Sequence, residues 1–422
     1  MTRGQTADLI IRHAAELLVC PAGGEGLGII EDGALLARDG RIVWVGRTAD
    51  LPAVAADASA DAAGRRTIDA TGRVVMPGLV ECHTHLVFGG SREHEFQMRA
   101  AGASYAEIAA AGGGIMSTVR ATRAASTEEL LHRGRTNLRA MLRLGLTTVE
   151  AKSGYGLSTE HELRLLEVYR MLDAEQPVDV VPTFLGAHVV GPEYRDCPDA
   201  YVDLVVEEML PAVAERGLAR FCDVFCEQGA FTLEQSRRVL AAGLEHGLRP
   251  KLHADQFADG GGGELAAELG AVSADHLDHI GDAGVAAMAA AGVTAVLLPG
   301  AVAFLGLHHF APARRLLEGG VRVALSTDFN PGSCHCMSPF IVVTLASSYL
   351  KMSLAEVLRA WTCEAAGALG LAGEVGSLEE GCRADIVVLD TYRAERIPYD
   401  FGVDHVETVI KDGLVVYEAG RA

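Results

Sequence analysis

The chain has 422 residues, of which 49% are hydrophobic and 22% charged, a composition typical of a soluble globular enzyme and not of a disordered chain. Its 56 acidic and 36 basic side chains give a formal charge of −20, which disfavours a nucleic-acid or anionic-membrane partner. The nine cysteines, an odd number scattered along a long chain, indicate reduced thiols. We therefore expect a cytoplasmic protein with one large and one small domain.

The two ends of the chain are predicted to form strands. Residues 34–46 (ALLARDGRIVWVG) place an Asp-Gly pair between two apolar runs, which is the pattern of a β-hairpin. Residues 406–418 (VETVIKDGLVVYE) repeat this pattern near the C-terminus. The ends are therefore expected to pair into a small β-sandwich domain, residues 1–76 and 366–422, around a central domain of residues 77–365.

In the central region, apolar strand-like runs alternate with longer amphipathic segments, which predicts βα units and a parallel sheet. Three of the segments carry helix-start pairs: Ser126 with Glu129, Thr159 with Glu162, and Thr232 with Gln235. The eight strand-like runs are residues 78–83, 146–151, 180–188, 220–227, 249–254, 271–276, 293–299 and 321–328. They predict an α/β fold, a TIM-type (β/α)8 barrel whose active site lies at the carboxyl ends of the strands.

One segment is long and apolar enough to suggest a membrane span. Residues 283–307 carry no charged side chain over 25 positions. However, the segment is rich in Ala and Gly, is broken at Pro299-Gly300, and divides into a small-residue run and a β-branched run. This pattern favours a buried helix and strand of the barrel.

Metal-competent side chains end five of the eight predicted strands. They are His83 and His85, His188, His253, His276, and Asp328. A single histidine in such a place is more often a hydrogen-bonded core residue, but the coincidence at five strand ends favours a metal site. In a strand, an H-x-H pair directs both rings to one face, about 7 Å apart.

His83 and His85, together with His253 and Asp328, would supply three neutral imidazoles and a carboxylate. This set suits one divalent metal ion, Zn²⁺ or Fe²⁺, and does not distinguish between them. Such an ion lowers the pKa of water toward about 7.

Several motifs resemble known proteins. PGLVECHTHL, KLHADQF, SADHL and STDFNPGS resemble the metal signatures of the amidohydrolase superfamily, and GGSREHEF, EAKSGYGL and GAHVVGP are similar to its imidazolonepropionase family. The resemblance extends from about residue 8 to residue 415. The fourth predicted strand ends in VFCE and lacks the lysine that bridges the two metals in two-metal members, so the chain resembles the one-metal members. Lys152, which follows the second strand, is the only nearby lysine, and we interpret it as a solvated or hydrogen-bonding side chain.

The resemblance implies hydrolysis of 4-imidazolone-5-propanoate, a small anionic substrate, to N-formimino-L-glutamate by a homodimer. Asp328 would carry the proton from the attacking water to the leaving nitrogen. His276 would orient the water or stabilise the oxyanion, or alternatively would act as a fourth ligand or contact one. Arg92 would bind the substrate carboxylate. The other implied substrate contacts are Tyr155, His188, Gln256, Asn330, Gly332 and Ser333.

Two alternatives remain, and the first is a cytosine- or guanine-type deaminase or another cyclic-amide hydrolase on the same barrel. Related cytosine and guanine deaminases use a glutamate at the position of Gln256, and an amide cannot ionise, so deamination is disfavoured but Gln256 leaves open which group protonates the leaving nitrogen. The second alternative is a barrel without catalysis that serves as a scaffold, against which the four intact ligand positions argue.

Overall fold

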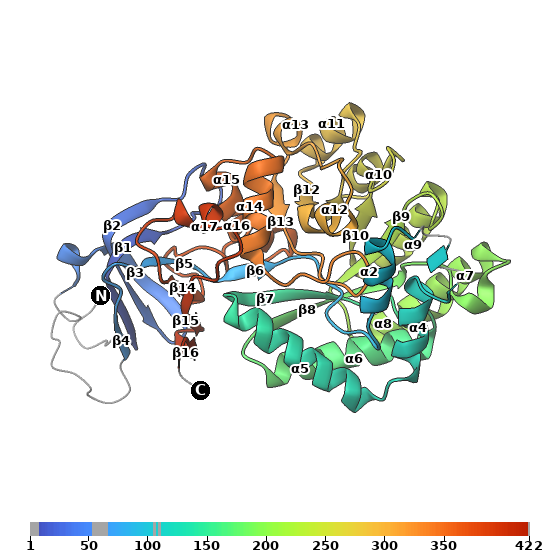
Figure 1. The fold of residues 1–422 in the computed structure, drawn as a ribbon, viewed down its shortest axis with the longest axis horizontal. Helices are drawn as coiled ribbons and strands as arrows, with labels where there is room; N and C mark the ends of the chain where they lie inside the picture. Colours follow the sequence, from blue (N-terminus) through green and yellow to red (C-terminus); the bar gives the residue numbers. More distant parts are fainter. Residues whose placement is uncertain (1–7, 53–65, 104–106, 109–110, 421–422) are drawn as a thin grey trace. The chain divides into compact units, whose positions relative to one another are not determined.

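The computed structural model describes residues 8–52, 66–103, 107–108 and 111–420 (Figure 1). The chain divides into two compact units, one of residues 1–82, 140–148 and 338–422 and the other of residues 83–139 and 149–337. The domain limits that we expected from the sequence, with residues 77–365 as the barrel, stay a prediction.

The eight predicted barrel strands are all present, and they follow one another in chain order in one sheet. They are β6 (Leu79–Glu81), β7 (Leu146–Lys152), β8 (Asp179–Ala187), β9 (Phe221–Cys226), β10 (Arg249–Ala254), β11 (Ser273–His276), β12 (Thr294–Leu297) and β13 (Val323–Leu325). Beyond β6 and β13, an isolated parallel bridge joins Thr84 to Phe329. The predicted barrel fold is therefore confirmed.

Nearly every residue of these strands is buried, as expected for a parallel sheet that is covered on both faces. The connecting helices include α4 (Ile115–Ala124), α5 (Thr127–Arg143), α6 (Thr159–Glu175), α7 (Pro198–Leu204), α8 (Leu210–Glu215), α9 (Leu233–Glu245), α10 (Gly262–Glu268), α11 (Asp282–Ala291), α12 (Pro299–Leu305) and α13 (Ala313–Glu318). A short helix, α2 (Glu93–Ala100), follows β6. Three more, α14 (Pro339–Tyr349), α15 (Leu354–Ala360) and α16 (Cys363–Ala368), follow the barrel strands.

Two of the three predicted helix starts are capping boxes. Ser126 and Glu129 exchange hydrogen bonds at the start of α5, and Thr232 and Gln235 do the same at the start of α9. The third prediction was wrong in detail. Helix α6 does begin at Thr159, but Glu162 binds the preceding loop instead of capping the helix.

The apolar segment 283–307 forms most of α11, then β12 and α12, so its reading as a buried helix and strand is confirmed. Of the helices in the described part of the chain, none combines the length and the apolar character that a membrane crossing requires.

The N- and C-terminal strands form a second, mixed sheet, in which blue and red strands lie side by side in Figure 1. Its members are β1 (Leu9–Leu18), β2 (Ile29–Arg38), β3 (Arg41–Arg47), β4 (Arg66–Asp69), β5 (Val74–Pro77), β14 (Ile386–Leu389), β15 (Val406–Lys411) and β16 (Leu414–Glu418). Both predicted hairpins are present, and at Asp39-Gly40 and Asp412-Gly413 both turn residues have positive φ, as a two-residue hairpin turn requires.

Candidate active site

Six polar side chains that we predicted to meet at one end of the barrel lie at the carboxyl ends of their strands. They are His83 and His85 (after β6), His188 (after β8), His253 (in β10), His276 (in β11) and Asp328 (after β13). All six side chains are buried. The topology of the barrel therefore brings together residues that are far apart in the sequence.

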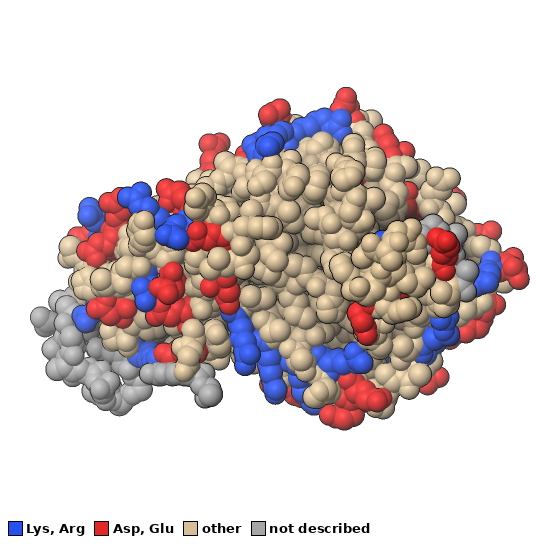
Figure 2. Space-filling view, viewed as in Figure 1, with Lys and Arg blue, Asp and Glu red and all other residues tan. Residues whose placement is uncertain are grey.

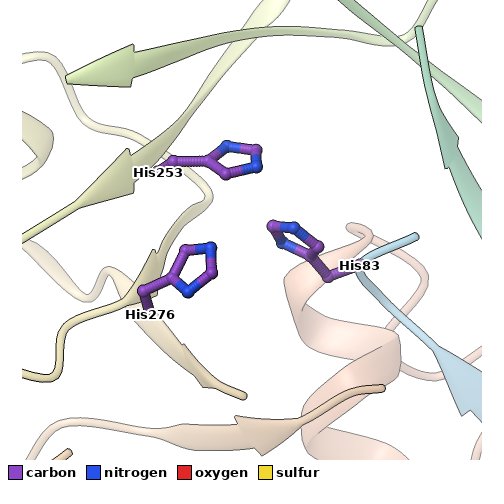
Figure 3. Close-up of side chains that lie close together, drawn as sticks. All are labelled: His83, His253 and His276. Carbon is purple, nitrogen blue, oxygen red and sulfur yellow. The ribbon is translucent and has the colours of Figure 1, made fainter. Parts of the chain in front are cut away.

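The rings of His83, His253 and His276 point toward one another (Figure 3). The His83 centroid lies 4.5 Å from that of His253 and 5.5 Å from that of His276, and the latter two are 5.4 Å apart. His85 lies 5.7 Å from His83 and 5.6 Å from His253. Four imidazoles therefore surround one small space.

Among the described residues, three groups could hold a metal ion, and all three contain His83. The group with Glu150 and Asp275 already has the ammonium of Lys152 between its two carboxylates, so the other two groups are the candidates. One combines His83 with His253 and His276, and the other with His85 and Asp328, and within each group the ligand atoms lie within 4.8 Å of one another. The Asp328 Oδ1 atom is 3.5 Å from His83 Nε2 and 3.9 Å from His85 Nε2. The structure thus places His276 beside His83 and His253, and the roles of the four predicted ligands stay a prediction.

The donor set fits a divalent cation because two rings already have their outer nitrogens engaged. His83 Nδ1 lies 2.7 Å from Asp275 Oδ2, and His253 Nδ1 lies 3.1 Å from Asp223 Oδ1. An ionised carboxylate can only accept, so each Nδ1 carries the proton and each Nε2 presents its lone pair toward the centre. In the described part of the chain, His253 Nε2 has no hydrogen-bond partner.

Burial also keeps these rings in the form that binds metal. It lowers the pKa of His83, His85 and His253 well below the usual value. It lowers the pKa of His276 to about 4. At neutral pH all four imidazoles are therefore uncharged ligands.

Lys152 is hydrogen-bonded and fully buried in this region, not solvated. Its Nζ atom lies 2.7 Å from Asp223, 3.1 Å from Glu150 and 3.2 Å from Asp275. Two of these carboxylates are the partners of His253 and His83. The ammonium group therefore compensates part of the negative charge of the two carboxylates that orient these rings.

The main chain is strained at two of the central residues. His276 has φ 75° and Asp328 has φ 55°, values that L residues with a side chain rarely adopt. Such conformations persist where the surrounding structure imposes them, and they cluster at functional sites.

The predicted substrate-binding residues line one cavity of about 680 Å³, together with four of the central side chains. They are Arg92, Tyr155, His188, Gln256, Asn330, Gly332 and Ser333. The central members that line it are His85, His253, His276 and Asp328. All these residues belong to the unit of residues 83–139 and 149–337.

Glu162 holds the loop that carries Tyr155. Its carboxylate accepts hydrogen bonds from the main-chain N–H groups of Gly154, Gly156 and Leu157. His188 Nδ1 lies 3.0 Å from the Gly154 carbonyl oxygen. Because a carbonyl only accepts, this nitrogen carries the proton and donates it, and the Nε2 atom of His188 is available to the cavity.

Asn330 shapes the opposite loop with its own side chain. The amide nitrogen donates to the Asp328 carbonyl and to Ser333 Oγ, and the amide oxygen accepts from the N–H groups of Gly332 and Ser333. These bonds occupy most of the capacity of the amide, so its predicted contact with substrate stays a prediction.

Comparison with known proteins places the chain in a family. A profile described as "Amidohydrolase family" matches residues 106–417. The chain is 49% identical to the imidazolonepropionase of Brevibacillus brevis, over 99% of both chains. It is 52% identical to that of Geobacillus kaustophilus, over 94% of this chain and 92% of the relative. The chain belongs to the imidazolonepropionase family of amidohydrolases. The predicted hydrolase class is thereby confirmed.

Solved structures support the fold of this amidohydrolase. An adenosine deaminase from Xanthomonas campestris with bound zinc superposes with a TM-score of 0.72 at 21% identity, covering 97% of this chain and 93% of that one. The zinc complex of the atrazine chlorohydrolase from Arthrobacter aurescens gives 0.73 at 20% identity, covering 98% and 96%.

Sequence reasoning missed several residues around the site of this amidohydrolase. They are Glu95, Arg99, Asp223, Lys251 and Asp275. A detectable pattern exists for three of them: Asp223, Lys251 and Asp275 are charged residues inside otherwise apolar strands. Charged side chains are rarely buried without a partner, so each indicated a polar network inside the barrel.

Gly332 leaves no room for a side chain beside the guanidinium of Arg92. A methyl group at this position would overlap the Nη1 atom of Arg92. Because the end of an arginine side chain can move, we expect Gly332→Ala to fold normally but to raise KM about tenfold through displacement of the guanidinium. Steady-state kinetics would check this, with Gly367→Ala, where a methyl group meets open space, as the matched control. An unchanged KM would contradict the expectation.

Proposed function

We propose that this amidohydrolase opens the ring of 4-imidazolone-5-propanoate to N-formimino-L-glutamate, in the cytoplasm and as a homodimer, with one Zn²⁺ or Fe²⁺ ion. The observation that carries the proposal is the cluster of neutral imidazoles beside Asp328 at the end of a cavity that Arg92 also lines. The imidazolonepropionase relatives at about half identity over nearly the whole chain support the substrate.

His83, His85, His253 and Asp328 would hold the cation, with His276 within reach of the same space. A divalent cation bound there would supply the Lewis acidity that activates water near neutral pH. With such a cation, no strong base is needed to deprotonate the water. The residues around the centre then have to position the reactants and move protons.

The reaction adds a water oxygen to the ring carbonyl carbon and breaks the bond between that carbon and the ring nitrogen. A carboxylate oxygen of Asp328 would take a proton from the water and deliver it to the leaving nitrogen. His276, whose Nδ1 atom has no hydrogen-bond partner among the described residues, would donate to the developing oxyanion or orient the water.

Gln256 lines the cavity and would contact the ring. Its amide can donate and accept hydrogen bonds but cannot ionise, and it therefore disfavours deamination, which uses an acid at this position in related deaminases. Tyr155, His188 and Ser333 would enclose the ring from the other sides.

The overall charge of −20 argues against a polyanionic partner. Figure 2 shows basic side chains interspersed with acidic ones on the face it presents. A small anionic substrate would instead meet a local positive charge inside the cavity.

A paired assay tests the proposal. The purified protein would be incubated with synthetic 4-imidazolone-5-propanoate, with ring opening followed by mass spectrometry and ammonia measured in parallel. We expect N-formimino-L-glutamate without ammonia. Ammonia release from cytosine or guanine, with no ring opening of the imidazolone, would favour the deaminase alternative, and a protein with neither activity nor bound metal would favour the scaffold.

A further inference from the structure

Two guanidinium groups converge on Gly332 at the wall of the cavity. Arg99 donates from both terminal nitrogens to the Gly332 carbonyl, at 3.3 Å each. The Nη1 atom of Arg92 is the atom that a methyl group on Gly332 would meet. Both arginines belong to the cavity lining. Two like charges therefore lie close together at one place.

The charge of Arg92 is already compensated by its own neighbour. Its Nε and Nη2 atoms donate to Glu95 Oε2 at 3.0 and 2.8 Å. The second oxygen of Glu95 accepts from Gly114 N and Ser117 Oγ. The ion pair is largely shielded from solvent, with the Arg92 side chain 14% and the Glu95 side chain 9% exposed. Glu95 therefore fixes the orientation of the Arg92 guanidinium, and the pair of Arg92 and Glu95 has no net charge.

Arg99 has no such partner. Within the described ranges, no Asp or Glu forms an ion pair with it. Its guanidinium packs near the rings of Phe96 and Phe304, at 5.9 and 5.6 Å from their centroids. Burial and the neighbouring charge of Arg92 lower the pKa of Arg99, and the charge of Glu95 opposes them only in part. The group of Arg92, Glu95 and Arg99 therefore carries one uncompensated positive charge, in a protein whose overall charge is −20.

We propose that Arg99 binds the substrate carboxylate, supplying the uncompensated charge while Arg92, held by Glu95, supplies an oriented donor. The proposal rests on the proposed function for the identity of the anion, a carboxylate at the end of a short flexible tail. An anion that meets two guanidiniums, one of them unpaired, gains charge-assisted hydrogen bonds in a partly desolvated site.

The test compares an acid with its neutral amide. Kinetics would use 4-imidazolone-5-propanoate and its propanamide, with wild type, Arg99→Gln and Arg99→Lys. We expect Arg99→Gln to raise KM for the acid about 10- to 100-fold with kcat within about threefold, and to leave kcat/KM for the amide unchanged. Arg99→Lys, which keeps the charge, should recover part of the loss.

Arg120→Gln is the matched control, because Arg120 also donates to a glycine carbonyl, that of Gly112, but does not line the cavity. It should behave as wild type. If Arg99 only tied α2 to the Gly332 loop, the acid and the amide would suffer equally in Arg99→Gln, which would overturn the proposal.

Calorimetry with imidazole-4-propanoate and its amide separates this proposal from the proposed function, because it needs no turnover. Wild type should bind the acid more tightly than the amide, and Arg99→Gln should lose that preference. A wild type without turnover but with the preference would reject the assigned reaction and keep the carboxylate site. A wild type with no preference, or a preference that Arg99→Gln retains, would overturn the role of Arg99.

Discussion

Replacing Asp328 by asparagine is expected to lower kcat by about 10²- to 10⁴-fold, the usual contribution of a positioned proton-transfer group. The substitution preserves the shape of a side chain that is 2% exposed, so the fold should survive. Circular dichroism would verify folding and steady-state kinetics would measure the loss. Asp50→Asn, at an exposed position, is the control. A kcat within tenfold of wild type would remove Asp328 from the proton path.

The Asp328→Asn substitution is also expected to change how the stability of the protein depends on pH. Burial raises the pKa of Asp328 from 3.8 to about 8. Because the folded pKa lies above the unfolded one, the folded state binds the proton more tightly, and the contribution of Asp328 to stability is lost as the pH rises from about 4 to about 8. In protein treated with a chelator, Asp328→Asn should therefore gain stability over wild type at pH 8 and gain less at pH 5. Urea unfolding at the two pH values would measure this, and an equal difference at both would contradict it.

Replacing Lys152 by methionine is the second change with a large expected effect. It would remove the ammonium that pairs with the buried Asp223 and Asp275, while Glu150 would keep Lys251 at 2.8 Å. Removing one member of a buried ion pair typically lowers the free energy of unfolding by about 3–5 kcal/mol. Metal affinity should also fall by about 10- to 100-fold, because two of these carboxylates orient His83 and His253.

Urea unfolding and a competition assay with a metal chelator would measure the two effects of Lys152→Met. Lys351→Met, at an exposed position, should change neither. A double variant that adds Asp223→Asn removes one of the stranded charges and should recover part of the stability. A loss below about 1 kcal/mol in the single variant would show that the buried network does not need its cation.

The barrel could be read from the sequence because its strands are short apolar runs separated by amphipathic segments. The position of the active site could be predicted in the same way, since His83, His188, His253 and Asp328 each lie at the end of such a run. Pairing of distant strands was harder. Strand β1 pairs with β2, β4 and β5. The sequence predicted that the two ends of the chain pair, but the only individual strand pairs it predicted there were those of the two Asp-Gly hairpins, β2 with β3 and β15 with β16.

The polar groups that support the site depended on tertiary structure. Glu162 stands three residues after Thr159, as in a capping box. Its carboxylate instead accepts hydrogen bonds from three N–H groups of the preceding loop. Arg99 lies seven residues after Arg92, which is two helical turns, so their shared face was detectable in principle. What the spacing does not give is that Glu95 neutralises the first arginine and leaves the second unpaired.

We expect the imidazoles at the end of the barrel to surround a single metal ion. X-ray diffraction from crystals of the isolated protein, recorded on both sides of the zinc and iron absorption edges, would locate this ion and identify it. The expected result is one anomalous peak in contact with the Nε2 atoms of His83 and His253. A strong peak elsewhere, or none among these rings in a catalytically active preparation, would contradict it.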